Sequence, residues 1–489
     1  MDGMKNMNLR KKDRLSSLPD DILSVILSHL QINSVVATSI LSRRWRYLWT
    51  TVTNFKFEHD NQYLSKRRSI KFSTVVVNIV RQLTSQKLGV FKLQLSSLSN
   101  LCDASVADLC FREICGRNVE QIIIEEVPGY NNNLFPIPAF LFSSQNLVVL
   151  ILRGMIKFNL PEKTDIQLPN LRKISLTYLV SVPHQFLGSL FRSCQRLIDA
   201  DLMFNDYITQ PEPQIVLNIS GPELRSLQIR FLAHLHTQRP KILIDAPELE
   251  TLYINSFTSD YYSIQNPAKL VNVSIQMYMN EEYNYFREED CLKEMFKFVK
   301  QMSSVRKLFL RVQANEVTNV YRYFNSVNLK DMTTFPNLER LETNLDYDDW
   351  KDLILSMKCF PNLRHLRVDI NMDTYTDAMD CDWCVPECLS KLKTIEIYGV
   401  HDIRYDLTLL EYILSNALVL EKLHVQRTGL KSLNLTDNKA KLRYFCKSLF
   451  QLPRASSTCE IVFRLRGFVR VSSNDWKNRK VTPENFRVI

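Results

Sequence analysis

A short pattern of large aliphatic residues recurs along most of this chain and constrains its fold more than any other feature. The pattern is LxxLxL, with isoleucine or valine also allowed at the large positions. Two copies are imperfect, because Ala200 and Thr343 replace large residues. The pattern occurs in 13 units, whose starts are 21 to 35 residues apart and lie at Val90, Val119, Leu147, Leu171, Leu197, Leu224, Leu249, Leu270, Val305, Leu338, Leu363, Leu392 and Leu420.

Most of these spacings fall in or just above the 20–29 residues of a leucine-rich repeat. Each unit would give one short strand with inward-facing large residues and a return segment. One unit cannot bury its apolar face alone, but stacked neighbours can. We therefore expect an α/β solenoid, a curved parallel sheet with helical or irregular return segments. The alternative is chance repetition in a leucine-rich α/β protein, and the 13 copies of the pattern argue against it.

Two spacings are longer than the rest, namely the 35 and 33 residues that follow Leu270 and Val305. Residues 281–290 hold five acidic side chains, and 291–302 have a helical pattern. We interpret these as enlarged return segments. The acidic stretch is expected to be a solvated face rather than a binding feature.

Glycine is scarce, which excludes several kinds of enzyme site. The chain has 10 glycines in 489 residues, and no two lie closer than Gly116 and Gly129. A dinucleotide-binding GxGxxG loop, a P-loop and a GxSxG nucleophile elbow all need closely spaced glycines. No HExxH zinc-protease motif and no cysteine-protease signature occur either. A Ser-His-Asp triad stays open, because sequence does not show which side chains are close together.

The net charge of +10 lies mostly at the two ends of the chain, since residues 1–14 carry +3 and residues 461–489 carry +5. A protein that reads nucleic acid is expected to concentrate its charge on a folded face, so nucleic-acid binding is disfavoured. The start of the chain has no apolar secretory segment, and no aliphatic run is long enough to span a membrane. The eleven cysteines then indicate reduced thiols and an intracellular protein, in the nucleus or the cytoplasm.

Two groups of residues have a superficial likeness to metal sites. Cys381, Cys384 and Cys388 precede His401, and His234 lies two residues before His236. The cysteine spacing is irregular for zinc, and no acidic partner closely follows the two histidines. We expect ordinary reduced cysteines and surface histidines, and therefore no metal and no cofactor.

Residues 14–50 form a candidate module of three short helices. Ser17 can cap the first helix, Pro19 lies near its first turn, and Asp20 and Asp21 favour the positive end of its dipole. Large apolar residues follow at helical spacing. Three short helices make a poor core on their own, so the module either presents an apolar partner surface or packs on the rest of the chain as a cap.

These residues resemble the F-box of plant proteins, through Leu18-Pro19-Asp20-Asp21-Ile22-Leu23 and Ser39-Ile40-Leu41-Ser42-Arg43-Arg44-Trp45-Arg46-Tyr47-Leu48-Trp49. The resemblance implies docking on a Skp-family adaptor, which links an F-box protein to a cullin scaffold. The candidate adaptor-facing residues that it implies are Leu18, Pro19, Ile22, Leu23, Ile26, Val35, Trp45 and Leu48. Some of these side chains would instead hold the three helices together.

The C-terminal part resembles the FBD domain that ends many plant F-box proteins with leucine-rich repeats. The resemblance rests on VPECL at 385–389, LKTIEI at 392–397, YILSNA at 412–417, LEKL at 420–423 and PRASS at 453–457. Ala455 stands where the family pattern would have glycine. The expected organisation is a basic flexible N-terminus at 1–13, an F-box at 14–60, a leucine-rich-repeat solenoid at 85–375, an FBD domain continuing the solenoid at 380–465 and a basic tail at 466–489.

Alternate residues of the repeat strands should project from the concave face of the sheet. In three successive units these are Lys307, Phe309 and Arg311, then Arg340, Glu342 and Asn344, then His365, Arg367 and Asp369. The pattern indicates a basic patch able to receive an acidic segment, a phosphate or a small anionic ligand. The alternative is a mixed-charge, solvated sheet face, and we favour this second interpretation. The candidate target-binding residues are Lys307, Phe309, Arg311, Arg340, His365 and Arg367.

Together these features favour a substrate-recognition subunit of an SCF-type cullin–RING ubiquitin ligase with no catalytic residue of its own. A scaffold or decoy whose F-box assembles no ligase is the alternative within the same architecture. A hydrolase site carried on a solenoid is the alternative from another class.

Overall fold

The computed structural model divides into two compact units, Met1–Met203 and Phe204–Ile489. The residues that it describes are 15, 17–58, 72–95, 104–126, 135–159, 165–180, 184–204, 216–231, 241–255, 261–278, 288–313, 320–325, 334–346, 349–370, 387–400, 403–427, 444–465 and 470–472. Nearly all of the two basic tails therefore lies outside the described residues.

The first unit begins with a cluster of short helices, as the sequence predicts. Pro19 stands at the N-cap of the first helix, and two acidic residues occupy its first turn. Buried side chains from all three α-helices, among them Leu27, Ile32 and Trp45, form the interior of the cluster or pack beneath it. The elements are α1 (Asp20–Ser28), α2 (Ile32–Ala37), η1 (Thr38–Ile40), α3 (Trp45–Leu48) and η2 (Trp49–Thr51).

The rest of the first unit consists of parallel strands joined by return helices. Parallel pairs link β1 to β2, β2 to β3, β3 to β5, and β5 to β6, while β4 pairs with the far half of β5. The strands are β1 (Asn54–Glu58), β2 (Val90–Leu95), β3 (Gln121–Glu126), β4 (Phe135–Pro138), β5 (Val149–Asn159), β6 (Lys173–Val180) and β7 (Asp199–Phe204). The return helices are α4 (Phe72–Gln82), α5 (Ala104–Cys115), η4 (Ala139–Ser143) and α6 (His184–Ser193).

The second unit repeats this arrangement over nine parallel strands, from β9 to β19, followed by the antiparallel β20. Its main strands are β9 (Ser226–Phe231), β11 (Thr251–Asn255), β13 (Asn272–Tyr278), β14 (Lys307–Gln313), β15 (Arg340–Leu345), β16 (His365–Ile370), β17 (Thr394–Val400), β18 (Lys422–Arg427), β19 (Glu460–Leu465) and β20 (Arg470–Ser472).

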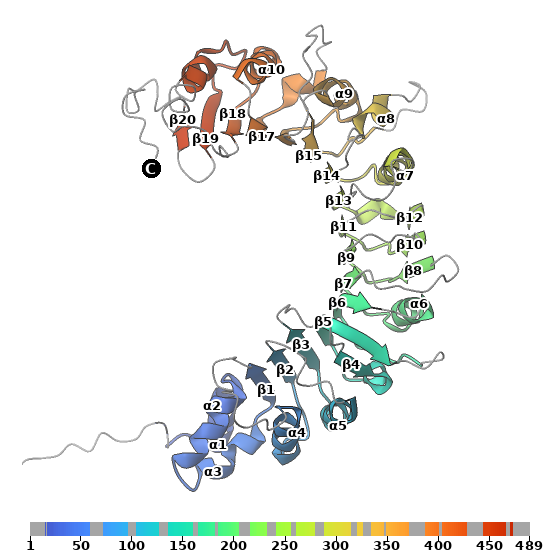
Figure 1. The fold of residues 1–489 in the computed structure, drawn as a ribbon, viewed down its shortest axis with the longest axis vertical. Helices are drawn as coiled ribbons and strands as arrows, with labels where there is room; N and C mark the ends of the chain where they lie inside the picture. The colour runs from blue at the N-terminus through green and yellow to red at the C-terminus, as the bar shows by residue number, and fades with distance from the viewer. Residues whose placement is uncertain are drawn as a thin grey trace, which may run out of the picture. The chain divides into compact units, whose positions relative to one another are not determined.

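Helices of the second unit lie on one face of its strands, and the described helices leave the other face open (Figure 1). They are η5 (Pro267–Lys269), α7 (Glu288–Lys300), α8 (Tyr321–Asn325), α9 (Trp350–Ser356), η9 (Met357–Cys359), η10 (Glu387–Lys391) and α10 (Ile403–Asn416). The mixed α/β fold of N-terminal helices followed by long parallel sheet, which the repeat pattern predicts, is confirmed.

The predicted repeat register agrees with the structure in 12 of the 13 units, where the strand begins two residues after the first large residue of the pattern. The unit assigned to Val90 is wrong by two residues. Val90 pairs with Gln121, so the large positions of this unit are Leu88, Phe91 and Leu93, all of them buried. The shift arose because the search pattern admitted only aliphatic residues and therefore missed the phenylalanine.

The same restriction hid two further strands. β1 carries Phe55 and Phe57 at the inward positions and extends the first sheet by one strand. β19 carries Ile461 and Phe463 and extends the second sheet beyond the last predicted unit. Phe55 and Phe91 stack on each other with ring centroids 5.1 Å apart, so aromatic residues continue the core that leucines build elsewhere.

Three return segments of the second unit are strands rather than helices. β8 (Val216–Ser220), β10 (Lys241–Asp245) and β12 (Tyr261–Gln265) form a separate parallel sheet. Their burial alternates along each strand, with Leu217, Ile242 and Tyr262 among the buried residues. This alternation was present in the sequence, but the expected helical or irregular return segments did not include strands.

The two longest repeats, which start at Leu270 and Val305, contain additional helices. α7 and α8 occupy their return segments, as predicted for 291–302. Their aromatic rings pack into one cluster, in which Phe324 lies 4.7 Å from Phe296, 5.6 Å from Phe360 and 6.1 Å from Phe335 between ring centroids. The acidic stretch 281–290 lies mostly outside the described residues.

One of the few glycines is required by the sheet itself. Gly399 adopts φ +90°, at an irregularity in the pairing of β17 with β18. A Cβ at this position would lie 2.3 Å from the carbonyl oxygen of Ile370 on the neighbouring β16. Any side chain here would therefore be excluded both by backbone conformation and by space.

Candidate binding surfaces

The structure divides the eight predicted adaptor-facing residues into two groups. The side chains of Leu23, Val35, Trp45 and Leu48 are buried, with exposures between 0% and 5%. They hold the helices together and do not line the free surface, so for these four the structure supports the core role. Pro19, Ile22 and Ile26 are exposed, and Leu18 is half-buried.

The exposed residues belong to a larger apolar surface that sequence reasoning only partly identified. Fourteen large apolar side chains are exposed over the described residues, and eight of them lie between residues 15 and 47. Ile22, Val25 and Ile26 follow one another on a single face of α1 because of their helical spacing. We call the eight residues the N-terminal apolar patch: Leu15, Ile22, Val25, Ile26, Leu30, Ile40, Leu41 and Tyr47.

Arg44 joins the two sequence motifs that flank this patch. Its Nε donates to Asp20 Oδ1 at 2.7 Å, and its Nη2 donates to the Leu18 carbonyl oxygen at 2.5 Å. The guanidinium thereby fixes the chain just before α1 against the segment that leads into α3. This contact gives a physical reason why the Leu-Pro and Arg-Trp motifs occur together in one module.

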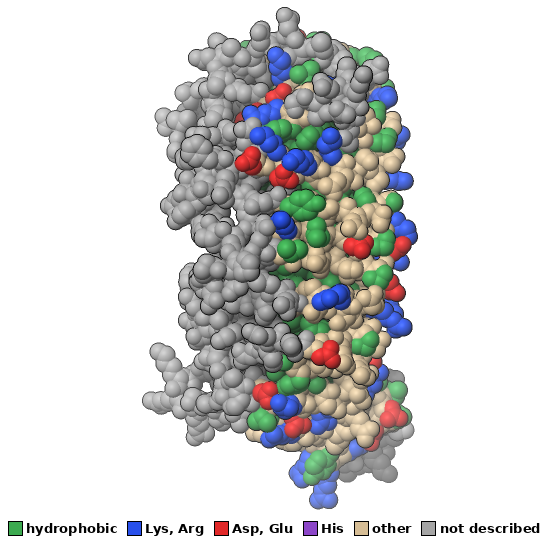
Figure 2. Space-filling model, turned by 90° about the vertical axis from the view of Figure 1, so that its right-hand side faces the viewer, with side chains coloured by type: hydrophobic (Ala, Val, Ile, Leu, Met, Phe, Trp, Pro, Cys, Tyr) green, Lys and Arg blue, Asp and Glu red, His purple; other side chains and the backbone are tan. Residues whose placement is uncertain are grey.

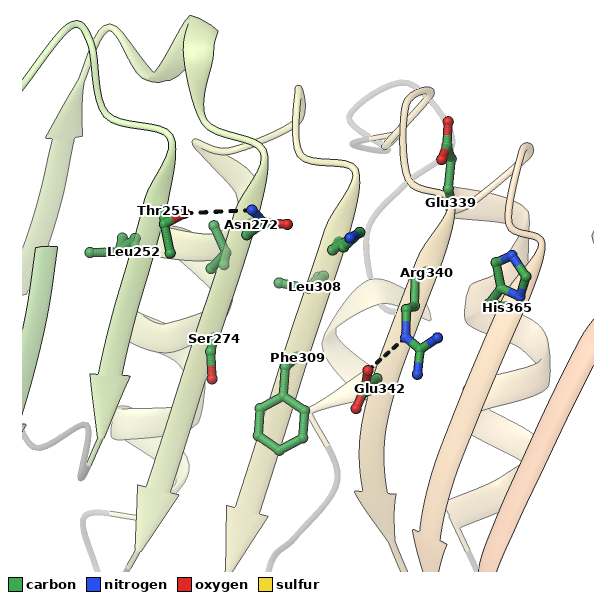
Figure 3. Close-up of a pocket in the computed structure, with 12 residues that line it drawn as sticks. Thr251, Leu252, Asn272, Ser274, Leu308, Phe309, Glu339, Arg340, Glu342 and His365 are labelled. Carbon is green, nitrogen blue, oxygen red and sulfur yellow. Dashed lines mark hydrogen bonds and ion pairs between the residues drawn. The ribbon is translucent and has the colours of Figure 1, made fainter. Parts of the chain in front are cut away.

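On the second unit, the strand register brings the predicted target-facing residues side by side. Lys307 on β14 pairs with Arg340 on β15, which in turn pairs with His365 on β16. Phe309 pairs with Glu342, which pairs with Arg367. Figure 3 shows Phe309, Arg340, Glu342 and His365 projecting from the same face of these strands.

The two arginines at the centre of this face are already paired with acidic groups. Arg340 Nε donates to Glu342 Oε1 at 2.6 Å, and its Nη2 lies 3.8 Å from Glu396 Oε1. Arg367 lies 3.4 Å from Asp369 Oδ1 and 3.8 Å from Glu342 Oε2. The predicted basic patch is therefore a mixed-charge network, in which three carboxylates face two guanidinium groups.

An aromatic side chain completes this network from β17. The guanidinium carbon of Arg367 lies 4.4 Å from the ring centroid of Tyr398, whose hydroxyl donates to Glu396 Oε2 at 2.8 Å. Burial, followed by the hydrogen bond to Glu396, raises the pKa of Tyr398. Glu396 and Tyr398 lay one unit beyond the three that the sequence argument considered, and the repeat register alone would have placed them beside Arg367.

Lys307 has a different environment from the two arginines. Among the described residues, its ammonium group has neither an ion pair nor a hydrogen bond, and its side chain is exposed.

Arg311, further along the same strand, is half-buried, and its Nε is buried with no hydrogen-bond partner in the described part of the chain. Burial and the nearby Arg340 lower the pKa of His365, which therefore stays neutral at neutral pH.

A cavity of about 540 Å³ opens on this face over β11 to β16. Phe309 and Lys307 line it together with Arg340 and Glu342, and Figure 3 shows the ring of Phe309 beside the ion pair. Thr251, Asn272 and Ser274 add hydroxyl and amide groups from β11 and β13. The cavity thus offers an aromatic surface, polar side chains and the ammonium group of Lys307, which has no ion pair with any described residue.

Asn344 does not project from the open face as predicted. Its side chain is 4% exposed, and its amide bonds to the backbone of the neighbouring strand. Val312 N donates to Asn344 Oδ1 at 2.7 Å, and Asn344 Nδ2 donates to the Val312 carbonyl. Regular pairing of β14 with β15 ends at Thr343, so the amide continues the hydrogen bonding where the strands separate.

The cysteines and histidines considered as metal ligands are only partly covered. Cys381, Cys384, His401, His234 and His236 lie outside the described residues, as does the side chain of Cys388. Within the described ranges, no group of three or more His, Cys, Asp or Glu residues is arranged to hold a metal ion. Burial raises the pKa of the thiols of four described cysteines to about 12, which keeps them protonated at neutral pH: Cys110, Cys115, Cys194 and Cys446.

Charges of both signs are interspersed on the molecular face that Figure 2 shows, with apolar side chains scattered between them. The described part of this face carries no broad field of a single sign. No helix among the described residues is both long and apolar enough to cross a membrane.

Three protein-family descriptions match parts of the chain. The F-box domain family matches residues 15–57. The family described as "FBD-associated F-box protein At5g56370, LRR repeats" matches residues 107–343. The FBD family matches residues 382–425.

Several Arabidopsis thaliana proteins resemble the chain over most of its length. F-box/FBD/LRR-repeat protein At4g26340 is 27% identical over 461 residues, which cover 92% of this chain and 100% of the relative. FBD-associated F-box protein At3g52670 is 26% identical over 474 residues, covering 94% and 99%. F-box/LRR-repeat protein At3g59200 is 28% identical over 330 residues, covering 64% and 61%. The F-box, leucine-rich-repeat and FBD matches follow one another in this order, and the chain is similar over most of its length to the Arabidopsis F-box/FBD/LRR-repeat proteins.

Proposed function

We propose that this chain is the substrate-recognition subunit of an SCF-type cullin–RING ubiquitin ligase. The observation that carries the proposal is the N-terminal apolar patch, which lies within the matched F-box and holds eight of the 14 exposed large apolar side chains of the described chain. Exposed apolar surface concentrated in this way marks a protein–protein contact. An F-box implies a Skp-family adaptor as the partner, and the adaptor in turn binds a cullin scaffold.

The open sheet face of the second unit is the proposed target surface. Its centre is the network of Arg340, Glu342, Arg367 and Glu396, beside the cavity lined by Phe309. A mixed-charge network favours a target that presents both an acidic and a basic group, because each new contact must replace an existing ion pair. Lys307 adds one cation that needs no such exchange.

A receptor of this kind acts by proximity. Holding the target and the charged conjugating enzyme on one scaffold raises the effective concentration of a target lysine near the ubiquitin thioester. The chain then supplies binding and orientation and needs no catalytic residue. The protonated thiols of the buried cysteines fit this role better than that of a nucleophile.

Complex assembly tests the proposal directly. The full-length chain is mixed with a purified Skp-family adaptor and a cullin–RING pair, and the mass of the complex is measured by size-exclusion chromatography with light scattering. We expect one complex that contains all components. A complex with the adaptor that fails to recruit the cullin would favour the scaffold or decoy, and failure to bind the adaptor would contradict the proposal.

A further inference from the structure

A second cavity lies in the first unit, at the ends of the strands where the chain enters them. Its volume is about 770 Å³, and the side chains that line it are polar or charged except for Val148. Neither the F-box surface nor the proposed target face includes it. Apart from Gln86, its walls come from corresponding positions of successive repeats, namely the residue just before the first large residue of each unit and the residue just after it.

Asparagines build one wall of this groove. Asn146 Nδ2 donates to Asn118 Oδ1 at 2.9 Å, and Asn170 Nδ2 donates to the carbonyl oxygen of Gln145 at 2.8 Å. Arg196 occupies the equivalent position of the next unit and donates through Nη1 to Asn170 Oδ1 at 3.1 Å. The ladder fixes the amides in a row, and most of the N–H groups of Arg196 have no acceptor within the described ranges.

Arg172 is the exceptional cation of the groove. Within the described residues, its guanidinium has no hydrogen bond and no ion pair, although it carries five N–H donors. The repeat positions that flank it on the neighbouring strands are Val148 and Ile198, and neither can accept a hydrogen bond through its side chain. An arginine at this position therefore has to find its partner outside the described chain or remain solvated.

The equivalent arginine of another unit shows what an acidic neighbour would do. Arg225 follows the first large residue of its repeat, as Arg172 does, and lies 3.6 Å from Glu250 of the next unit. Lys393 and Glu421, at the same positions of two later units, lie 2.8 Å apart. The groove lacks this compensation at Arg172, because its one carboxylate, Glu120, already lies 2.7 Å from Lys87.

The groove thus has an excess of hydrogen-bond donors and two cations, Arg172 and Arg196, with no acidic partner among the described residues. A phosphate monoester carries −1.5 to −2 charges near neutral pH and offers three acceptor oxygens. It matches both the charge and the donor excess, whereas a single carboxylate matches only half of the charge. We propose that the groove lined by Arg172, Arg196 and the asparagine ladder binds the phosphate dianion of a phosphate monoester.

The test uses the full-length chain and one short fluorescent peptide in three versions, with serine, phosphoserine or glutamate at its centre. Inorganic phosphate serves as a competitor, and its own binding is followed by broadening of its ³¹P resonance. We expect saturable binding that requires phosphate, with the phosphoserine peptide at least about tenfold tighter than the glutamate peptide. Competition distinguishes the two sources: displacement by equimolar inorganic phosphate indicates a free phosphate ligand, and resistance to it indicates a phosphorylated chain.

Matched variants locate the site. Arg172→Gln combined with Arg196→Gln should weaken phosphate binding at least about tenfold, because both substitutions remove charge-assisted donors. Arg225→Gln, at the equivalent repeat position, should leave binding unchanged. Binding that survives the double substitution, an equal loss in the Arg225 variant, or no phosphate-dependent signal with either ligand would overturn the proposal. Adaptor capture is measured in parallel and should be unaffected, so this outcome is separate from that of the proposed ligase function.

Discussion

The side-chain amide of Asn344 takes the place of a backbone partner for Val312, accepting a hydrogen bond from its N–H at 2.7 Å and donating one to its carbonyl. The pair lies where β14 and β15 stop pairing regularly. Removing the amide would take a hydrogen-bond partner from both the N–H and the carbonyl of Val312. A buried polar group without a partner costs about 1–3 kcal/mol.

Asn344→Ala should therefore lower the free energy of unfolding by roughly 1–3 kcal/mol, measured by urea denaturation. Asn255→Ala is the matched control, since Asn255 occupies the same repeat position on β11 but is only half-buried and bonds to the Tyr253 hydroxyl at 3.1 Å. We expect the control to lose clearly less stability. Equal losses would mean that the amide of Asn344 does not support the strand.

The inward leucines of the second unit give a test of the repeat register. Leu227 and Leu252 pair across β9 and β11 and are fully buried, whereas Arg225 and Glu250 are exposed. Leu→Ala at either buried position should cost about 2–5 kcal/mol. Arg225→Ala and Glu250→Ala should stay within about 1 kcal/mol, because their ion pair is solvated. Denaturant unfolding that ranks the four variants otherwise would contradict the register.

Adaptor binding should depend on the exposed side of α1. Ile22→Ser combined with Ile26→Ser removes two side chains of the N-terminal apolar patch, which are 48% and 39% exposed. We expect loss of capture by a Skp-family adaptor in a pulldown, with an unchanged thermal melt. Leu109→Ser, at a 43% exposed site on α5, controls for the general loss of an exposed apolar side chain.

A buried residue of the same helix should behave in the opposite way. Leu23 is fully buried, so Leu23→Ala should destabilise the module by about 2–5 kcal/mol and lower adaptor capture only through unfolding. Capture that recovers at a lower temperature would identify this indirect route. If the two serine substitutions left capture intact, the adaptor would have to contact another part of the module.

On the proposed target face, we expect different results from charge reversal at Lys307 and at the ion-paired Arg340. Lys307→Glu should weaken target capture without loss of stability, because Lys307 has no ion pair in the described part of the chain. Arg340→Glu would also place a new carboxylate beside Glu342 and Glu396, so stability and capture should fall together. Targets can be identified by proximity labelling with the full-length chain that carries Ile22→Ser and Ile26→Ser. Identical capture by the Lys307 variant at low salt would locate the target site elsewhere.

Strand positions were the most predictable part of this molecule, because inward leucines must recur wherever parallel strands stack. The prediction failed where a residue of another type occupies an inward position. At Phe91, a buried aromatic ring stands at a position for which the search pattern allowed only aliphatic residues. It also failed for β8, β10 and β12, because the expected return segments were helical or irregular and the alternation of apolar residues in these three segments was not considered.

The binding surfaces were less predictable, because a side chain's role depends on which neighbours it meets. Ile22 and Leu23 are adjacent and chemically alike, yet one is exposed and the other is fully buried. Arg340 and Arg367 lie on neighbouring strands, as the repeat register predicted, but the second carboxylate near Arg340 is Glu396, which comes from a later strand that the sequence argument did not consider. Asn344 had the right alternation for the open face and was drawn inward by a gap in backbone pairing.

The alternation along each repeat strand gives neighbouring residues of one short segment two different roles. In β16, Leu366 and Val368 are buried and maintain the stack, while His365 and Arg367 face outward. Substitutions at the outward positions can accumulate one strand at a time, because most surface changes alter stability by less than about 0.5 kcal/mol. The outward face of each strand can therefore change one residue at a time, while the buried face that holds the stack together stays the same.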